Sequence, residues 1–231
     1  MRLDELTSKG FAECVKNDPL IILPLGATES HGPHLPLGTD TFQPEYVLSV
    51  IDREFKDKVI IAPTLPYGQH CTARNVPGTI DLSFDTLRSV IRDILNAFIR
   101  HGVKRIMIIS GHAGTSHMKA VMEACREIAE RNPVDLSLFS DFYIAEKCSV
   151  PGTEGDGHAG LIETSRMLHI RPDTVTDERP SGTYRQFGYR ILGDASACLP
   201  DGVSGDTKNA SAEIGRKINE FIIKNIKEMI S

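Results

Sequence analysis

Leu20-Ile21-Ile22-Leu23-Pro24-Leu25-Gly26 is an uninterrupted apolar stretch that ends in glycine. A short run of branched apolar residues without polar alternation is typical of a strand buried on both faces of a parallel sheet. Two more runs of this kind occupy residues 59–62 and 105–109, and residues 134–139 are predicted to form a fourth strand. The chain is therefore predicted to contain a sheet of buried parallel strands.

Helical patterns lie between these strands. In the clearest of them, residues 84–98, apolar side chains recur with the helical period, Ser83 is the expected N-cap and Gly102 the expected stop. Amphipathic helices are also predicted over residues 118–129, 162–168 and 214–230. This alternation is typical of an α/β fold with a mostly parallel sheet and helices on both faces, in which ligands bind at the carboxyl ends of the strands. With no repeat or linker in residues 1–231, we expect a single domain.

Composition and charge argue against several classes of function. Apolar residues make up 40% of the chain, which is ample for a buried core. The 31 acidic and 26 basic residues give a net charge of -5 without a long run of either sign, which argues against binding nucleic acid or anionic membranes by bulk charge. The five cysteines form no Cys-x-x-Cys pair, and no apolar run reaches the ~18 residues of a membrane span. We therefore expect a cytoplasmic protein whose partner is a small molecule, with no nucleic acid and no membrane.

A loop rich in metal-ligand residues follows the first strand and reads Glu29-Ser30-His31-Gly32-Pro33-His34-Leu35-Pro36-Leu37-Gly38-Thr39-Asp40. Zinc, iron(II) and manganese accept imidazole and carboxylate ligands, and the lack of a thiolate favours a catalytic over a structural site. Glu29, His31 and Asp40 are therefore predicted to hold metal for hydrolytic chemistry. In the alternative reading, Glu29 caps a helix, His31 bonds to backbone, and Asp40 is the N-cap of the apolar run near Tyr46.

A second histidine-containing turn follows the third strand, where Ser110-Gly111-His112-Ala113-Gly114 places one imidazole among small residues. Small residues let the backbone approach a metal or a substrate closely. His112 is therefore the predicted fourth ligand, although a histidine that only bonds to its own turn would give the same pattern. His117 is expected in a helix or a pocket wall.

The segment Gly157-His158-Ala159-Gly160-Leu161-Ile162-Glu163 sets an imidazole and a carboxylate five residues apart at a helix N-terminus. We predict that His158 and Glu163 are catalytic, and that Glu163 is able to reach a second metal. Asp156 either moves protons or caps the helix.

Substrate contacts are expected from the polar loop that follows the second strand, Tyr67-Gly68-Gln69-His70. Arg74, Arg185 and Arg190 are candidates for a substrate phosphate, because guanidinium makes bidentate contacts with phosphate. None of the three is favoured individually.

These motifs together resemble the creatininase family of metal-dependent amidohydrolases. Members carry a Glu-x-His-Gly-x-His-x-Pro-x-x-x-Asp loop, a Gly-His-Gly/Ala-Gly turn and a His-Ala-Gly-x-x-Glu-Thr-Ser segment. The likeness covers most of the chain and includes Pro77-Gly78-Thr79-Ile80 and Gly202-Val203-Ser204-Gly205-Asp206 in the family's order. It implies a creatininase-like fold with Glu29, Asp40 and His112 on one metal, and with His31 and the bridging Asp40 on a second.

Two departures from the family argue against creatinine as the substrate. Members that hydrolyse creatinine resemble one another in having a carboxylate two residues after the turn histidine, which ligates the second metal, and in closing the pocket with tryptophan. This chain has Gly114 at that position and contains no tryptophan. The second metal would then rely on Glu163 or on water, or be weakly held.

The turn at residues 110–114, the histidine shortly after it and the compact length are similar to the archaeal deformylase branch of the family. This similarity implies release of formate from 2-amino-5-formylamino-6-ribosylaminopyrimidin-4(3H)-one 5'-monophosphate, a step toward riboflavin and the deazaflavin coenzyme. It also implies one or two divalent ions per subunit, with iron(II) first and zinc or manganese as alternatives, and a homo-oligomer. Gln69, His70 and His117 are the predicted substrate contacts.

Three other functions stay open at this point. Two lie within the family, hydrolysis of a cyclic amide such as creatinine and hydrolysis of a peptide. The third is a non-catalytic nucleotide-binding domain that keeps the α/β scaffold and uses the metal loop only for rigidity. A phosphate-binding arginine in the pocket would favour the nucleotide over a peptide.

Overall fold

The computed structural model describes residues 1–56 and 58–230. Four strands form one parallel sheet in the order β2-β1-β3-β4. Their bounds are β1 (Leu20–Leu25), β2 (Val59–Ile61), β3 (Arg105–Ser110) and β4 (Asp135–Ser140). The predicted parallel sheet is confirmed, and each of the four predicted strands lies within about one residue of its expected position.

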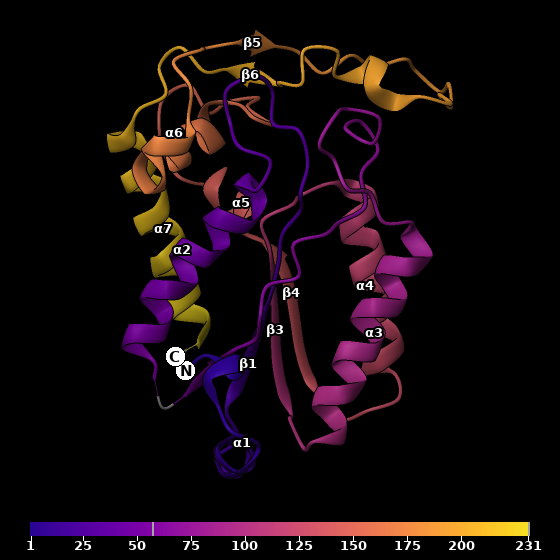
Figure 1. The fold of residues 1–231 in the computed structure, drawn as a ribbon, viewed down its shortest axis with the longest axis vertical. Helices are drawn as coiled ribbons and strands as arrows, with labels where there is room; N and C mark the ends of the chain where they lie inside the picture. Colours follow the sequence, from indigo (N-terminus) through magenta and orange to yellow (C-terminus); the bar gives the residue numbers. More distant parts are fainter. Residues whose placement is uncertain (57, 231) are drawn as a thin grey trace.

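Helices cover both faces of this sheet, as predicted (Figure 1). One face carries α3 (Phe84–Arg100) and α4 (Thr115–Ala129), and the other carries α2 (Thr39–Glu54), α5 (Asp141–Ala145), α6 (Leu161–Ile170) and α7 (Ala212–Ile230). The remaining elements are α1 (Ser8–Val15), 3-10 turns at Leu3–Glu5, Pro172–Thr174 and Ala195–Cys198, and an antiparallel pair, β5 (Ser181–Gly182) and β6 (Gly205–Asp206). In Figure 1 this pair lies above the main sheet.

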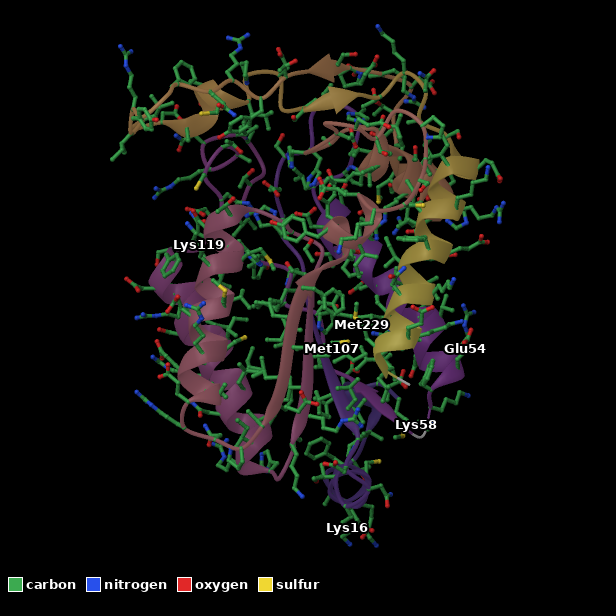
Figure 2. The ribbon with its side chains drawn as sticks, turned by 180° about the vertical axis from the view of Figure 1, so that it is seen from behind. Lys16, Glu54, Lys58, Met107, Lys119 and Met229 are labelled. Carbon is green, nitrogen blue, oxygen red and sulfur yellow. The ribbon has the colours of Figure 1, made fainter. Side chains whose placement is uncertain are left out.

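Two apolar cores form because alternate residues of each strand point to opposite faces. Ile22 and Met107 pack with α2 and α7, whereas Ile21 and Ile106 pack with α3 and α4. Figure 2 shows Met107 in the interior of the molecule, and the charged side chains of Lys16, Glu54 and Lys119 at its surface. Burial on both faces holds the strands rigidly, and their carboxyl ends therefore form a fixed platform.

Pro24 lies in a central strand, where proline is rare because it lacks a backbone N–H. The Pro24 carbonyl accepts from Leu65 N, so this residue faces the side of β1 on which β2 pairs. Because β2 already ends at Ile61, opposite Ile22, the missing N–H leaves no β2 carbonyl unpaired.

Helix boundaries follow the sequence where capping and periodicity agree. The Ser83 side chain caps α3 by accepting from Thr86 N, and Gly102 follows the helix with φ of 89°. The alternative reading of Asp40 as an N-cap is wrong. The helix already begins at Thr39 with Gly38 as its N-cap, so that Asp40 lies in the first turn. Within the described residues, no helix has the length and apolar character needed to cross a bilayer.

Gly215 provides a test of the packing between α6 and α7. A Cβ at this position would overlap the backbone carbonyl of Ser165. We expect Gly215→Ala to lower the free energy of unfolding by about 1–3 kcal/mol through overpacking. This loss should outweigh the helix propensity of alanine, which is more favourable than that of glycine by about 1 kcal/mol. Urea denaturation measures this change. In the control, Gly193→Ala, a Cβ meets no atom within 4 Å. Equal stability of the two variants would contradict this account.

Candidate functional site

The predicted ligands meet at the carboxyl ends of β1 and β3. The chain passes from β1 to β2 on one side and then returns to place β3 on the other side of β1, so the strand order reverses between β1 and β3. Open α/β sheets bind ligands at such a reversal. Glu29 and His31 come from the loop after β1, Asp40 from the first turn of α2, and His112 from the turn after β3.

Close backbone packing brings Asp40 to this point. A Cβ at Gly111 would overlap the Asp40 carbonyl oxygen and lie 2.9 Å from Pro44 Cδ, and a Cβ at Gly26 would lie 2.9 Å from Thr41 Cα. Pro44 has no N–H, so the Asp40 carbonyl has no helical donor four residues on. The two glycines therefore let the first turn of α2 sit directly on the ends of β1 and β3.

Asp40 links two groups of buried ligand atoms. Its Oδ2 lies 3.0 Å from His112 Nδ1, which is also 2.7 Å from Glu29 Oε1. Its Oδ1 lies 3.0 Å from His31 Nε2, and Glu163 Oε2 is 3.8 Å from the same nitrogen. The structure thus brings together all four predicted metal ligands, with Glu163 beside the second group.

The donor set fits divalent cations. Glu29 Oε1 is buried and accepts no hydrogen bond from the described residues, although His112 Nδ1 is 2.7 Å away. Such an orphaned oxygen is unusual in a protein interior. Glu29, His70 and His112 form one group whose ligand atoms lie within 4.8 Å of one another, and His31, Asp40 and Glu163 form another. Mixed imidazole and carboxylate oxygen donors suit zinc, manganese and iron(II).

Backbone carbonyl oxygens and the Glu29 carboxylate orient the histidine rings around this cluster. His31 Nδ1 contacts the Glu29 carbonyl at 3.1 Å, and His112 Nε2 contacts the Gln69 carbonyl at 3.2 Å. His70 Nδ1 lies 3.0 Å from Glu29 Oε2, which leaves Glu29 Oε1 as the oxygen that faces His112. Both predicted histidine ligands therefore present one ring nitrogen to the cluster while the other is held by backbone, as is usual at metal sites.

Electrostatics match this arrangement. Burial alone would lower the pKa of both imidazoles, but Asp40 raises the pKa of His31 to about 10, and Glu29 raises that of His112 well above its usual range. Burial raises the pKa of Glu163 well above its usual range, with the His31 charge opposing. Without a cation, the negative charges of the neighbouring carboxylates thus favour the protonated form of both imidazoles.

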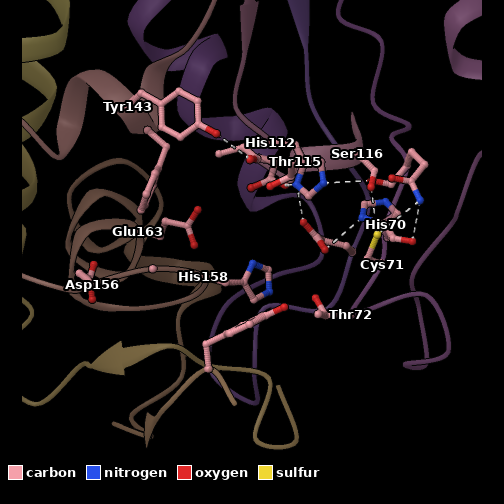
Figure 3. A pocket seen from close by; sticks show the side chains of 18 of the residues that line it. His70, Cys71, Thr72, His112, Thr115, Ser116, Tyr143, Asp156, His158 and Glu163 are labelled. Carbon is pink, nitrogen blue, oxygen red and sulfur yellow. Dashed lines mark hydrogen bonds and ion pairs between the residues drawn. The ribbon is translucent and has the colours of Figure 1, made fainter. Parts of the chain in front are cut away.

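A cavity of about 470 Å³ opens over the cluster and has two unlike sides. Figure 3 shows Cys71, Thr72, Thr115 and Ser116 on one side, and Tyr143, Asp156 and Glu163 on the other. Thr115 and Ser116 open helix α4. Within the described wall the first side offers neutral hydrogen-bonding groups, and the second offers aromatic and acidic groups.

The predicted catalytic residues lie together at the start of α6. His158 Nε2 contacts the Ser30 carbonyl at 2.8 Å, and its ring lies against that of His31 with centroids 4.3 Å apart. Burial, followed by the His31 charge, lowers the pKa of His158. Glu163 Oε2 accepts from Ala159 N at 2.6 Å. Both groups face the cavity, where an imidazole and a carboxyl group are able to exchange protons with a ligand.

Asp156 caps α6, the second of the two roles considered for it. Its two carboxylate oxygens accept from Leu161 N and Ile162 N, each at 2.8 Å. The cap fixes the turn that carries His158.

Gln69 and His70 line the cavity, whereas His117 is fully buried against His112, with ring centroids 4.9 Å apart. Of the candidate arginines, Arg74 pairs with Asp81 at 3.2 Å, and Arg185 and Arg190 line a neighbouring cavity of about 340 Å³ that shares Tyr184 with the first. The described wall of the main cavity itself contains no arginine or lysine.

Sequence reasoning missed part of the cavity wall. Phe142, Tyr143 and Glu146 come from α5 and the residue after it, and Thr115 and Ser116 come from the first turn of α4. These segments follow β4 and β3, so the rule that sites lie at the carboxyl ends of strands would have indicated them.

Comparison with known proteins identifies relatives along nearly the whole chain. The family model described as "Creatininase: Creatinine amidohydrolase" matches residues 4–230. The mycofactocin precursor peptide peptidase of Mycobacterium ulcerans is 31% identical over 229 residues, which cover 94% of this chain and 86% of that protein. A solved structure described as "Creatininase Mn" has a TM-score of 0.84 at 25% identity, covering 99% of this chain and 96% of that one. A mutant creatininase of the Zn–Zn type has a TM-score of 0.82 at 25% identity, with the same coverage.

Removal of the Asp40 carboxylate tests the cluster. Because Asp40 contacts both His31 and His112, we expect Asp40→Ala to weaken metal binding at both groups of ligands. A change in a residue outside the ligand set typically costs about 10–100-fold in metal affinity, and the loss at each group should exceed that. Titration of chelator-treated protein with Mn²⁺ and Zn²⁺, with elemental analysis for stoichiometry, measures the loss. Asp135→Asn, at an exposed carboxylate that begins β4, is the control. Full metal content in Asp40→Ala would rule out the bridging role.

Proposed function

The chain belongs to the creatininase family of metal-dependent amidohydrolases, and we propose that it releases formate from 2-amino-5-formylamino-6-ribosylaminopyrimidin-4(3H)-one 5'-monophosphate. The reaction adds water across the formamide C–N bond and yields formate and a free amine. The observation that carries the proposal is the cavity of about 470 Å³ that opens directly over the ligand cluster and has a neutral hydrogen-bonding side. A pyrimidinone ring presents amide and amine groups that suit such a side.

Glu29, Asp40 and His112 would hold one divalent ion, and His31, Asp40 and Glu163 a second. When bound, the ions would polarise the amide carbonyl and lower the pKa of water. Manganese and zinc are named for creatininase structures, and the donor set accepts iron(II) equally.

His158 is the group that we assign to proton transfer. Its Nε2 is engaged by the Ser30 carbonyl, which only accepts, so the neutral ring carries its hydrogen there and a lone pair at Nδ1. The lowered pKa keeps this ring neutral near pH 7. His158 would therefore take a proton from the attacking water and return it to the leaving amine.

Gly114 accounts for the room beside the cluster. A Cβ at Gly114 would lie 2.5 Å from His112 Nε2, so a larger residue would displace the ring or the turn. With glycine at this position, Glu163 is the second carboxylate near His31, after Asp40, and the space next to His112 is left to the substrate.

The neighbouring cavity provides a place for the substrate phosphate. Tyr184 lines both cavities, and Arg185 and Arg190 line the second one. Guanidinium groups in a cavity next to the cluster suit a phosphate at the far end of a ribosyl nucleotide, with the formamide at the cluster.

Peptide hydrolysis is the second candidate. Two observations favour it: a relative that is 31% identical is a peptide peptidase, and one side of the main cavity is acidic and aromatic, with no arginine or lysine in the described wall. A peptide substrate has no need of the arginines in the neighbouring cavity.

Formate release tests the proposed reaction. Chelator-treated protein, reloaded anaerobically with iron(II), manganese or zinc in separate arms, is expected to release one formate per nucleotide, and chelation should abolish this release. Without its phosphate, the same nucleoside should show a KM higher by about tenfold or more, the value of one or two charge-assisted hydrogen bonds. Creatinine and short peptides run in parallel. Metal-loaded protein that cleaves a peptide and releases no formate would replace the first candidate with the second.

The role of His158 has its own test. Because Gln is able to keep the contact with the Ser30 carbonyl, we expect His158→Gln to bind metal as the wild-type protein does and to lose about 10²–10⁴-fold in kcat. Elemental analysis and kcat, measured on the same sample, separate the two effects. A variant that loses its metal, or one that keeps the full rate, would contradict the assignment of proton transfer to His158.

A further inference from the structure

His117 takes no part in the reaction described above, yet it is a fully buried histidine beside a predicted metal ligand. Its ring meets that of His112 edge to face, with an interplanar angle of 82°. Space around it is tight, because a Cβ at Gly68 would lie 2.9 Å from His117 Nδ1. Most buried polar atoms have a hydrogen-bond partner, so the partners of the two His117 ring nitrogens indicate the role of this residue.

Four hydrogen bonds connect His117 to His112 in a closed circuit. His112 Nε2 donates to the Gln69 carbonyl at 3.2 Å, and Gln69 N donates to His117 Nδ1 at 3.4 Å. His117 Nε2 donates to Ser110 Oγ at 3.2 Å, and Ser110 Oγ donates to the His112 carbonyl at 2.7 Å. Each group donates once and accepts once around the circuit.

The direction of these bonds is fixed by groups that have only one role. A carbonyl oxygen only accepts, so the hydrogen of neutral His112 resides on Nε2 and the lone pair on Nδ1. A backbone N–H only donates, so His117 accepts at Nδ1 and carries its own hydrogen on Nε2. The opposite tautomer of His117 would set two donors against each other at Gln69.

We propose that His117 is a positioning residue that selects the metal-facing nitrogen of His112. It does so through two neighbours: Gln69, whose N–H donates to His117, receives the His112 Nε2 hydrogen on its carbonyl, and Ser110, which accepts from His117, donates to the His112 carbonyl. His112 Nδ1 then points at Glu29 Oε1 and Asp40 Oδ2. This inference rests on the proposed metal-dependent function but does not depend on which amide is hydrolysed.

Cobalt(II) binding to chelator-treated protein tests the inference without reference to turnover. We expect His117→Phe, which fills the space without polar atoms, to weaken Co²⁺ binding by about 10–100-fold, as outer-shell changes at metal sites do. Its visible absorption spectrum should also change, because the spectrum reports coordination geometry. His117→Asn, whose amide oxygen replaces Nδ1 as the acceptor for Gln69 N, should recover part of the affinity. Ser110→Ala removes the other half of the circuit and should lower affinity as well.

Val121→Ala is the matched control, since Val121 is fully buried one turn further along α4. It should lower stability through a cavity while leaving the Co²⁺ affinity and spectrum unchanged. Wild-type affinity in His117→Phe, or an equal loss of affinity in Val121→Ala, would overturn the proposal. Should His117→Phe fail to fold, unchanged affinity in both His117→Asn and Ser110→Ala would overturn it equally.

The same experiment separates this inference from the proposed reaction. Wild-type protein that binds Co²⁺ but releases no formate would refute the substrate and leave the role of His117 to be judged by the variants. Wild-type protein that binds no Co²⁺ would refute the metal centre and the role of His117 together.

Discussion

The carboxylate of Asp40 between His31 and His112 is the interaction on which the rest of the site depends. It joins the loop after β1 to the turn after β3, two segments that are otherwise far apart in the chain. The contact exists only because α2 begins directly on the strand ends, where Gly111 leaves room for the Asp40 carbonyl. Any side chain at that glycine would lift the first turn of α2 and separate the two halves of the cluster.

Rigid surroundings explain how buried carboxylates and imidazoles are held so close together. The ligands project from strand ends that are fixed by apolar cores on both faces, and backbone carbonyls or buried side chains occupy the ring and carboxylate atoms that face away from the cluster. Preorganisation of this kind reduces the cost of collecting like charges, because little rearrangement is needed when a cation binds. A capped helix, α6, brings His158 and Glu163 to the same place from the other side.

Local sequence patterns predicted the sheet, helix α3 and the ligand loops because each has a strong signal of its own: apolar runs, a 3.6-residue stripe with a cap, or clustered ligand residues. The start of α2 was not predictable, because a proline at position 44 and polar neighbours hide the helix that tertiary packing imposes. Helix α5 has five residues, too few to show a period. His117 was expected to contact substrate, but only the fold shows that its side chain points beneath the His112 turn instead of into the cavity. Likewise, only the fold assigns Arg185 and Arg190 to a neighbouring cavity.

Pro24 also limits the register between β1 and β2. If β2 slid by two residues toward the carboxyl end of β1, a β2 carbonyl would face the Pro24 nitrogen, which has no hydrogen to donate, and a buried acceptor would be left without a partner. That penalty opposes shifts in this direction from the alignment in which Val59 pairs with Leu20. The alignment of β2 also sets where the chain leaves the sheet after Ile61. It therefore sets the span between the end of β2 and the cavity wall, which Gln69 and His70 line. The missing N–H of Pro24 in β1 thus constrains the starting point of the loop that follows β2.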